Sequence, residues 1–161
     1  MKNLCMLGQE ARITTLAFIV PMLIASVLHA GEIHDAAAAG DLHKVKALLE
    51  AEPTLLESKD ERGNTPLITA CDGKQWAVAN FLIDKGANIH ARDNPGATPL
   101  FFAARDFDLS QRLVSIGADV NARAFVDYSY SALHIAAGNG NLKVAKLLID
   151  HGADLNFVRF R

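Results

Sequence analysis

From residue 31 onward, apolar residues recur at helical spacing in short segments, and these segments come in pairs. The second segment of the first pair carries Leu42, Val45, Leu48 and Leu49, a spacing that places one apolar stripe along a helix. The first segment of that pair, residues 33–39, is shorter and rich in alanine. The pattern therefore predicts pairs of short α-helices, in which the first helix is thin and the second is amphipathic.

The pairs recur with a nearly constant period. The motif Thr65–Leu67 returns as Thr98–Leu100, and Ser131–His134 fills the same place one period later, with offsets of 33 residues in both steps. Gly31–His34 occupies this slot 34 residues before Thr65. A period in this range is typical of stacked supersecondary units, each of which buries its apolar face only against its neighbours.

The repeated motif, T-P-L-x-x-A followed by an apolar helix that ends in G-A-[ND]-[VIL]-N, resembles the ankyrin repeat. The resemblance covers residues 31 to about 156 in four copies, although no copy carries the complete T-P-L-H. It implies an all-α solenoid of about four helix–turn–helix repeats joined by hairpin-like fingers. The expected repeats are residues 31–64, 65–97, 98–130 and 131–161.

The third repeat departs from the others in two places. Its helix–helix turn holds only Arg105 and Asp106, where the second repeat has Asp72–Gln75 and the fourth has Gly138–Asn141. The turn is two residues shorter, and the finger that follows, Ala122–Tyr130, is two residues longer than its counterpart. We expect this repeat to be the least stable of the four.

Residues 1–30 have the features of a secretory signal peptide. Lys2 and Arg12 precede the uncharged run Ile13–Leu28, and the small residue Ala30 follows. A membrane anchor is the alternative, but it needs about 20 apolar residues, and this run is shorter and contains a proline. We expect an exported protein, periplasmic or secreted, which agrees with the lack of cysteine pairs and N-x-[ST] acceptors after residue 30.

Charge and motifs exclude several classes of function. Of 16 basic and 18 acidic residues, Lys2, Arg12 and Glu10 precede residue 31, which leaves 14 and 17, a net charge of −3. This balance argues against a nucleic-acid binder, which needs a basic face to neutralise phosphates. The sequence contains no H-E-x-x-H, C-x-x-C, G-x-S-x-G or G-x-x-x-x-G-K, so it indicates neither an enzyme, a metal site nor a cofactor.

The histidines and the remaining cysteine have structural explanations. His34 and His134 hold the position at which, by the resemblance, a histidine ties the first helix to the neighbouring finger. They are too far apart in sequence to suggest a shared metal site, which needs three or four converging ligands. Cys71 stands where other repeats have alanine, so we expect a small buried hydrophobe, with a redox-active or intermolecular thiol as the alternative.

The resemblance implies a module that binds a protein partner, of unidentified nature, through the concave face and the fingers. The alternatives are a membrane-tethered scaffold, if the N-terminal segment is retained, and an enzyme or ligand carrier that uses Asp72, Arg105, Asp106 and Tyr128 in the groove. The positions expected to contact the partner are the finger tips, the residues before each Thr and the helix–helix turns. They are Arg62, Asn64, Asp72, Asn94, Arg105, Asp106, Arg123, Phe125, Tyr128, Tyr130 and Asn139.

The third finger is the strongest candidate because it concentrates Phe125, Tyr128 and Tyr130 in the longest loop. Aromatic residues are enriched at interface hot spots, and Arg105 and Arg123 are positioned to select an acidic or carbonyl-rich partner. The alternative is that the aromatics fold back over the gap left by the short turn. That alternative favours Phe125 over the tyrosines, because a tyrosine hydroxyl prefers contact with water.

Overall fold

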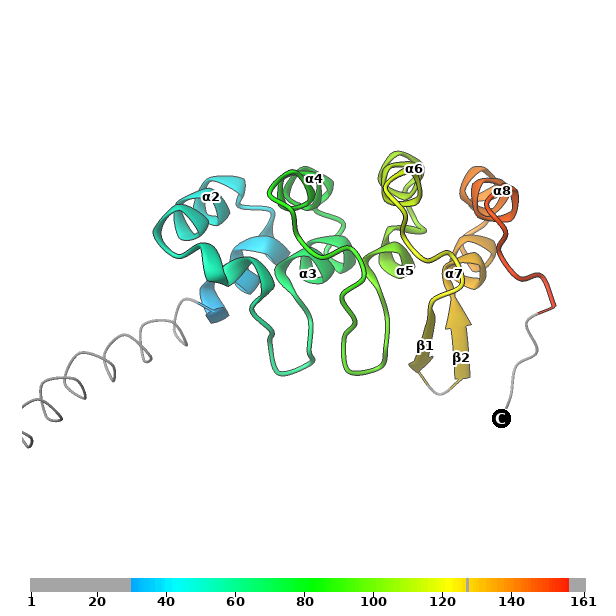
Figure 1. Ribbon diagram of the computed structural model, residues 1–161, viewed down its shortest axis with the longest axis horizontal. Helices are drawn as coiled ribbons and strands as arrows, with labels where there is room; N and C mark the ends of the chain where they lie inside the picture. Colours follow the sequence, from blue (N-terminus) through cyan, green and yellow to red (C-terminus); the bar gives the residue numbers. More distant parts are fainter. Residues whose placement is uncertain (1–29, 127, 157–161) are drawn as a thin grey trace, which may run out of the picture.

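A computed structural model describes residues 30–126 and 128–156 of the chain and shows one row of stacked helical pairs (Figure 1). The predicted signal peptide lies, apart from Ala30, outside the described residues. Within the described ranges, no helix has both the length and the apolar character needed to cross a membrane.

The elements follow the predicted order of short and long helices. A first helix covers residues 30–39 and pairs with α2. The later elements are α2 (Leu42–Ala51), the 3₁₀ helix η1 (Pro53–Glu57), α3 (Pro66–Asp72), α4 (Trp76–Asp84), α5 (Pro99–Ala103), α6 (Phe107–Ser115), β1 (Arg123–Val126), β2 (Tyr128–Ser131), α7 (Ala132–Gly138) and α8 (Leu142–Asp150). The predicted all-α solenoid is confirmed, with one two-stranded sheet added by the third finger.

The helices form two rows, and the fingers project from one edge (Figure 1). We call α3, α5 and α7 the inner row and α2, α4, α6 and α8 the outer row. A finger is the segment between an outer helix and the next inner helix: residues 58–64, 91–97 and 122–130 form the first, second and third fingers. The inner row and the fingers together form the surface that we call the inner face.

Side-chain caps start several of the helices. The Thr65 hydroxyl accepts a hydrogen bond from the backbone N–H of Ile68 at 3.4 Å, and Pro66 occupies the first helical position, where a missing donor costs nothing. The turns cap the outer helices in the same way. Asp41 and Asp106 each accept from a backbone N–H three residues later, both at 2.9 Å. The short turns therefore also fix where each outer helix begins.

One continuous apolar core runs along the stack between the two rows, from Ile33 to Leu148. Leu82, Leu113 and Leu148 occupy the same position in successive outer helices, and all three are fully buried. Cys71 is buried in this core, as expected, and burial raises the pKa of its thiol well above the usual range. A protonated, inaccessible thiol is a packing residue, which argues against the redox alternative.

The third repeat is short in its inner helix as well as in its turn. Helix α5 has five residues, whereas α3 and α7 each have seven. The carbonyl of Ala103, at the end of α5, accepts hydrogen bonds from the backbone N–H of Asp106 at 2.8 Å and from the hydroxyl of the buried Ser110 at 2.7 Å. The equivalent carbonyls of Ala70 and Ala136 also accept from the last residue of their turns, Gln75 and Asn141, both at 2.8 Å. The Ser110 hydroxyl therefore adds a second hydrogen bond between α5 and α6 across the shortened turn.

We predict that Leu113→Ala destabilises the domain by about 2–5 kcal/mol, the range for truncating a buried leucine, and that unfolding starts in the third repeat. Leu82→Ala is the matched control, because it makes the same deletion in the complete second repeat. Amide hydrogen exchange on the wild-type chain tests the order of opening: the amides of α6 should exchange faster than those of α4. Better protection of α6 than of α4 would show that the short repeat is not the weak one.

Candidate partner-binding surface

The third finger is a β-hairpin, whereas the described first and second fingers are loops. Strands β1 and β2 pair antiparallel, with Ala124 opposite Tyr130 and Phe125 opposite Ser129. Neighbouring residues of a strand point to opposite faces. Ala124 is fully buried, whereas the Phe125 side chain on the opposite face is 69 % exposed.

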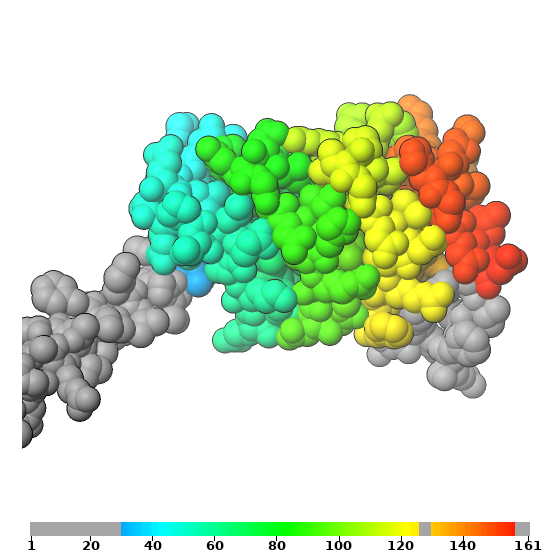
Figure 2. Space-filling model, in the orientation of Figure 1, coloured from blue at the N-terminus to red at the C-terminus, as the bar shows by residue number. Residues whose placement is uncertain are grey.

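The three fingers are connected by hydrogen bonds from basic side chains to the backbone of the next finger. Lys59 Nζ donates to the carbonyl of Arg92 at 3.3 Å. Arg92, its counterpart one repeat later, donates through Nη1 to the carbonyl of Arg123 at 3.2 Å. Each finger therefore holds the next in a fixed position, and Figure 2 shows them side by side at the lower edge of the molecule.

Glycines allow the fingers to approach closely. Gly63 and Gly96 have φ angles of +77° and +90°, which favour glycine. A Cβ on Gly63 would lie 2.4 Å from Asn94 Oδ1, and one on Gly96 would lie 3.1 Å from the carbonyl of Arg123. A larger residue at either position would force adjacent fingers apart.

Two equivalent aspartates organise the first two fingers but differ in electrostatics. Burial raises the pKa of Asp60, but hydrogen bonds from Asn64 and from the backbone N–H of Arg62 outweigh that effect, so the pKa is lowered. For Asp93, burial raises the pKa, and bonds from the backbone N–H groups of Ala97 and Gly96 compensate only in part. The folded state therefore stabilises the ionised form of Asp60 in the first finger. It destabilises the ionised form of Asp93 in the second finger.

An apolar patch lies where the third finger meets the inner row. Tyr130 is half-buried and packs with Phe102 and Ile135 over a small cluster that includes Ala124. The Tyr130 ring also meets the His134 ring edge-on, with centroids 5.9 Å apart. We call Phe102, Tyr130 and Ile135 the third-finger patch. Phe125 projects from the opposite face of the hairpin, because it neighbours Ala124 on β1 and Tyr130 pairs with Ala124. Tyr130 thus folds back and Phe125 projects, whereas the fold-back alternative favoured Phe125, because strand alternation decides which side chain turns inward.

Four of the predicted contact residues lie in the first two fingers or at the start of the third. Arg62 and Asn94 are exposed, and the carbonyl of Arg62 accepts from the backbone N–H of Asn94 at 2.8 Å. Asn64 is half-buried and bonds to Asp60 through its backbone and side chain. Arg123 is exposed on β1. Arg62, Asn94 and Arg123 therefore remain accessible to a partner on the fingers. Asn64 mainly stabilises the first finger through its hydrogen bonds to Asp60.

The predicted contact residues of the helix–helix turns lie apart from the finger tips. Their side chains mostly form contacts within the domain. Arg105 and Asp72 form an ion pair between the second and third repeats, with Nη1 and Oδ1 3.7 Å apart. The Asp106 carboxylate caps α6, and Asn139 donates to the carbonyl of Ile135 at 2.7 Å. The side chain of Tyr128 lies outside the described part of the structure, so its expected role stays a prediction.

The structure indicates no catalytic or metal-binding arrangement in the residues that it describes. No group of three His, Cys, Asp or Glu side chains within residues 30–126 and 128–156 could hold a metal ion. His34 has the structural role that the sequence suggested: its Nε2 donates to the carbonyl of Asn64 at 2.9 Å and so ties the first helix to the first finger. His134 instead contacts the Ser131 hydroxyl, at 2.9 Å, at the start of its own helix.

Phe102 and Ile135 are site residues that sequence reasoning missed. They follow T-P-L and S-A-L-H at the same helical position, which is Thr69 in the second repeat. Both are half-buried on the inner row beside Tyr130. The signal that could have found them was the change from a polar to an apolar residue at this position in the two repeats that flank the third finger.

Comparison with known proteins agrees with the repeat architecture. The family described as "Ankyrin repeats (3 copies)" matches residues 33–124 and 94–159. The chain is 33 % identical over 126 residues to a transient receptor potential cation channel subfamily A member 1 homolog of Caenorhabditis elegans, covering 77 % of this chain and 10 % of that protein. It is 34 % identical over 123 residues to a putative ankyrin repeat protein of Rickettsia felis, covering 74 % and 40 %. A probable 26S proteasome regulatory subunit p28 of Saccharomyces cerevisiae is 27 % identical over 128 residues, covering 76 % and 56 %. The chain thus spans between a tenth and about half of the length of these relatives.

The opposite pKa shifts of Asp60 and Asp93 predict opposite effects of the same substitution. Asp60→Asn removes a carboxylate that the folded state stabilises, so we expect a loss of about 1 kcal/mol at pH 7, the scale of one ordinary hydrogen bond, because asparagine keeps one acceptor oxygen. That loss shrinks as the pH falls below the reference pKa of 3.8, because Asp60 then becomes protonated in the wild type as well. Asp93→Asn removes an ionised carboxylate that the fold disfavours and keeps an acceptor for Ala97, so the free energy of unfolding at pH 7 stays equal or rises.

Chemical denaturation of the two variants at pH 7 and pH 3 measures both effects. The two substitutions are matched controls, since they make the same chemical change at equivalent finger positions. A loss of stability in Asp93→Asn as large as that in Asp60→Asn would contradict the assignment.

Proposed function

This chain belongs to the ankyrin-repeat family, and we propose that it is a non-catalytic module that binds a protein partner through the third finger, Phe125 above all, and the adjoining inner face. Ankyrin repeats are generally protein–protein interaction modules. The observation that carries the proposal is the exposure of Phe125, an aromatic side chain left 69 % in water at the end of the most regular finger. Aromatic side chains in this setting are the residues most enriched at binding hot spots.

The geometry of the patch suits the recognition of another protein. Phe102, Tyr130 and Ile135 provide a half-buried apolar surface on one face of the hairpin, spanning the third finger and two inner helices, and Phe125 projects from the other face. The Arg92 side chain and the backbone pairing of β1 with β2 hold the hairpin in place before any partner arrives. A preorganised finger loses little conformational entropy on binding, which favours affinity.

The enzyme alternative receives no support from the residues named for it. Arg105 and Asp72 pair with each other, and the Asp106 carboxylate accepts a helix N–H. These contacts explain the three described side chains as structural, and among those three no base is placed beside a nucleophile.

We further propose that the protein is exported and acts in the periplasm or as a secreted protein. The support is the sequence of residues 1–30 alone, with its basic start, apolar run and small residue before Gly31. The alternative is a membrane-tethered scaffold that keeps this segment. Intact mass of the exported protein distinguishes the two: a mature chain that begins near Gly31 supports cleavage, and one that begins at Met1 supports the tether.

We predict that Phe125→Ala weakens partner binding by about tenfold or more, the scale of an aromatic hot spot, while the melting temperature changes little. Ile116→Ala is the matched control, because Ile116 is also exposed but follows α6 in the outer row. Tyr130→Ala should instead lower the melting temperature, since its ring packs on Phe102 and Ile135.

Co-purification of partners with each variant from the native host, followed by quantitative binding of the recovered partner, provides the measurement. A photo-crosslinking residue at position 125 should attach to that partner, and the same residue at position 116 should not. Undiminished binding by Phe125→Ala would assign recognition to another surface.

A further inference from the structure

The outer row contains a pocket between α2 and α4 on the other side of the helical stack from the inner face. Leu49 from α2, Leu56 from η1 and Phe81 from α4 provide its apolar wall. The pocket has a volume of about 570 Å³ and is open on one side. That volume lies within the range typical of small-molecule sites, which are mostly apolar with a few placed polar groups.

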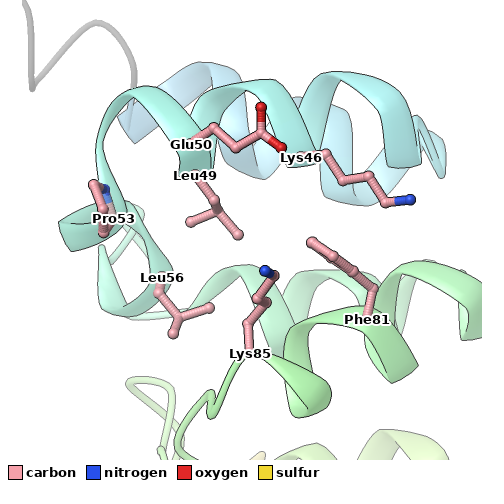
Figure 3. Close-up of a pocket in the computed structure, with 7 residues that line it drawn as sticks. All are labelled: Lys46, Leu49, Glu50, Pro53, Leu56, Phe81 and Lys85. Carbon is pink, nitrogen blue, oxygen red and sulfur yellow. The ribbon is translucent and has the colours of Figure 1, made fainter.

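The ammonium groups of two lysines lie close to the apolar wall of the pocket. Lys46 Nζ lies 5.4 Å and Lys85 Nζ 5.5 Å from the centroid of the Phe81 ring. Figure 3 shows the two ammonium groups on opposite sides of this ring, with Lys46 coming from α2 and Lys85 from the end of α4. Among the described residues, neither lysine forms an ion pair. Glu50, the third charged group of the lining, leaves a net charge of +1.

The next groove along the outer row shows why this one is open. Phe81 is the sixth residue of α4, and Arg112 is the sixth residue of α6. Arg112 reaches back across its groove, where Nη1 donates to Asn80 Oδ1 at 2.6 Å and Nη2 pairs with the Asp84 carboxylate. Phe81 has no polar group with which to close the α2–α4 groove in this way. The replacement of arginine by phenylalanine therefore leaves an apolar recess with two cations at its edge.

We propose that the α2–α4 pocket is a binding site for a monoanionic amphipathic carboxylate, with the acid at the pocket edge that carries Lys46 and Lys85 and an apolar tail over Leu49, Leu56 and Phe81. An apolar wall calls for an alkyl or aryl tail, and the lysines call for an anion. The net lining charge of +1 matches one carboxylate and disfavours a phosphate dianion, which Glu50 would repel. This site is independent of the partner-binding function proposed for the inner face.

Straight-chain fatty acids, used below their critical micelle concentrations, are the probes that test the site. Nuclear magnetic resonance titration of the full chain with octanoate and decanoate should give saturable shifts at residues of α2, η1 and α4. Each added methylene that enters the pocket should raise the affinity by about threefold to fourfold. Decyltrimethylammonium, with the same tail and the opposite charge, should not compete.

The double variant Lys46→Gln with Lys85→Gln should bind decanoate about tenfold more weakly, because two exposed charge interactions are lost. Both lysines are exposed, so the fold should be retained. Lys143→Gln on α8 is the matched control and should bind as the wild type does. Equal affinity in the double variant, shifts centred on the exposed Leu142 and Leu155, or the absence of saturable binding would each overturn the proposal.

Discussion

No repeat in this chain can bury its apolar face alone, and the whole structure depends on that constraint. Leu82, Leu113 and Leu148 are fully buried only because an inner helix and an outer helix of the next repeat, or of the preceding one, cover them. The free energy of folding therefore resides largely in the interfaces between repeats, and a change in one repeat acts first on its neighbours. The short α5 keeps the turn contact of its neighbours, from the Asp106 N–H to the Ala103 carbonyl, and Ser110 from α6 adds a second hydrogen bond to the same carbonyl.

The fingers add a second, polar connection along the stack. Lys59 and Arg92 repeat one hydrogen bond from finger to finger, and Gly63 and Gly96 let the backbones come close enough to form it. The core sets the spacing of the repeats, and these hydrogen bonds between fingers fix the direction in which the fingers project. Exposed side chains can differ between the repeats of such a rigid scaffold without disturbing the core. We therefore expect binding sites at the positions where one repeat differs from the others. The third finger and the α2–α4 pocket are two such places.

The sequence predicted the fold well because its signals are local and repeated. The pairs of short helices, the apolar stripe that includes Val45 and Leu49, and the two missing residues of the third repeat all followed from period and residue type. The hydrogen bonds between fingers could not be predicted in the same way, because their acceptors are backbone carbonyls, which have no sequence signature. The orientation of Phe125 and Tyr130 was also beyond the pattern: it depends on the register of β1 with β2, and a shift of one residue would exchange their faces. The pocket lined by Phe81 depends on comparing equivalent positions across a groove, which requires the helices in place.

Truncation of the stack tests most directly the claim that stability resides between repeats. A chain limited to residues 31–97, which keeps the first two repeats and their internal sequence unchanged, should show little helical circular dichroism at 25 °C and no cooperative melting. Residues 31–161 under the same conditions should be helical and melt in one cooperative transition. Native helicity and an independent cooperative transition in the 31–97 chain would show that a pair of repeats is stable by itself, and would contradict the dependence of each repeat on the full stack.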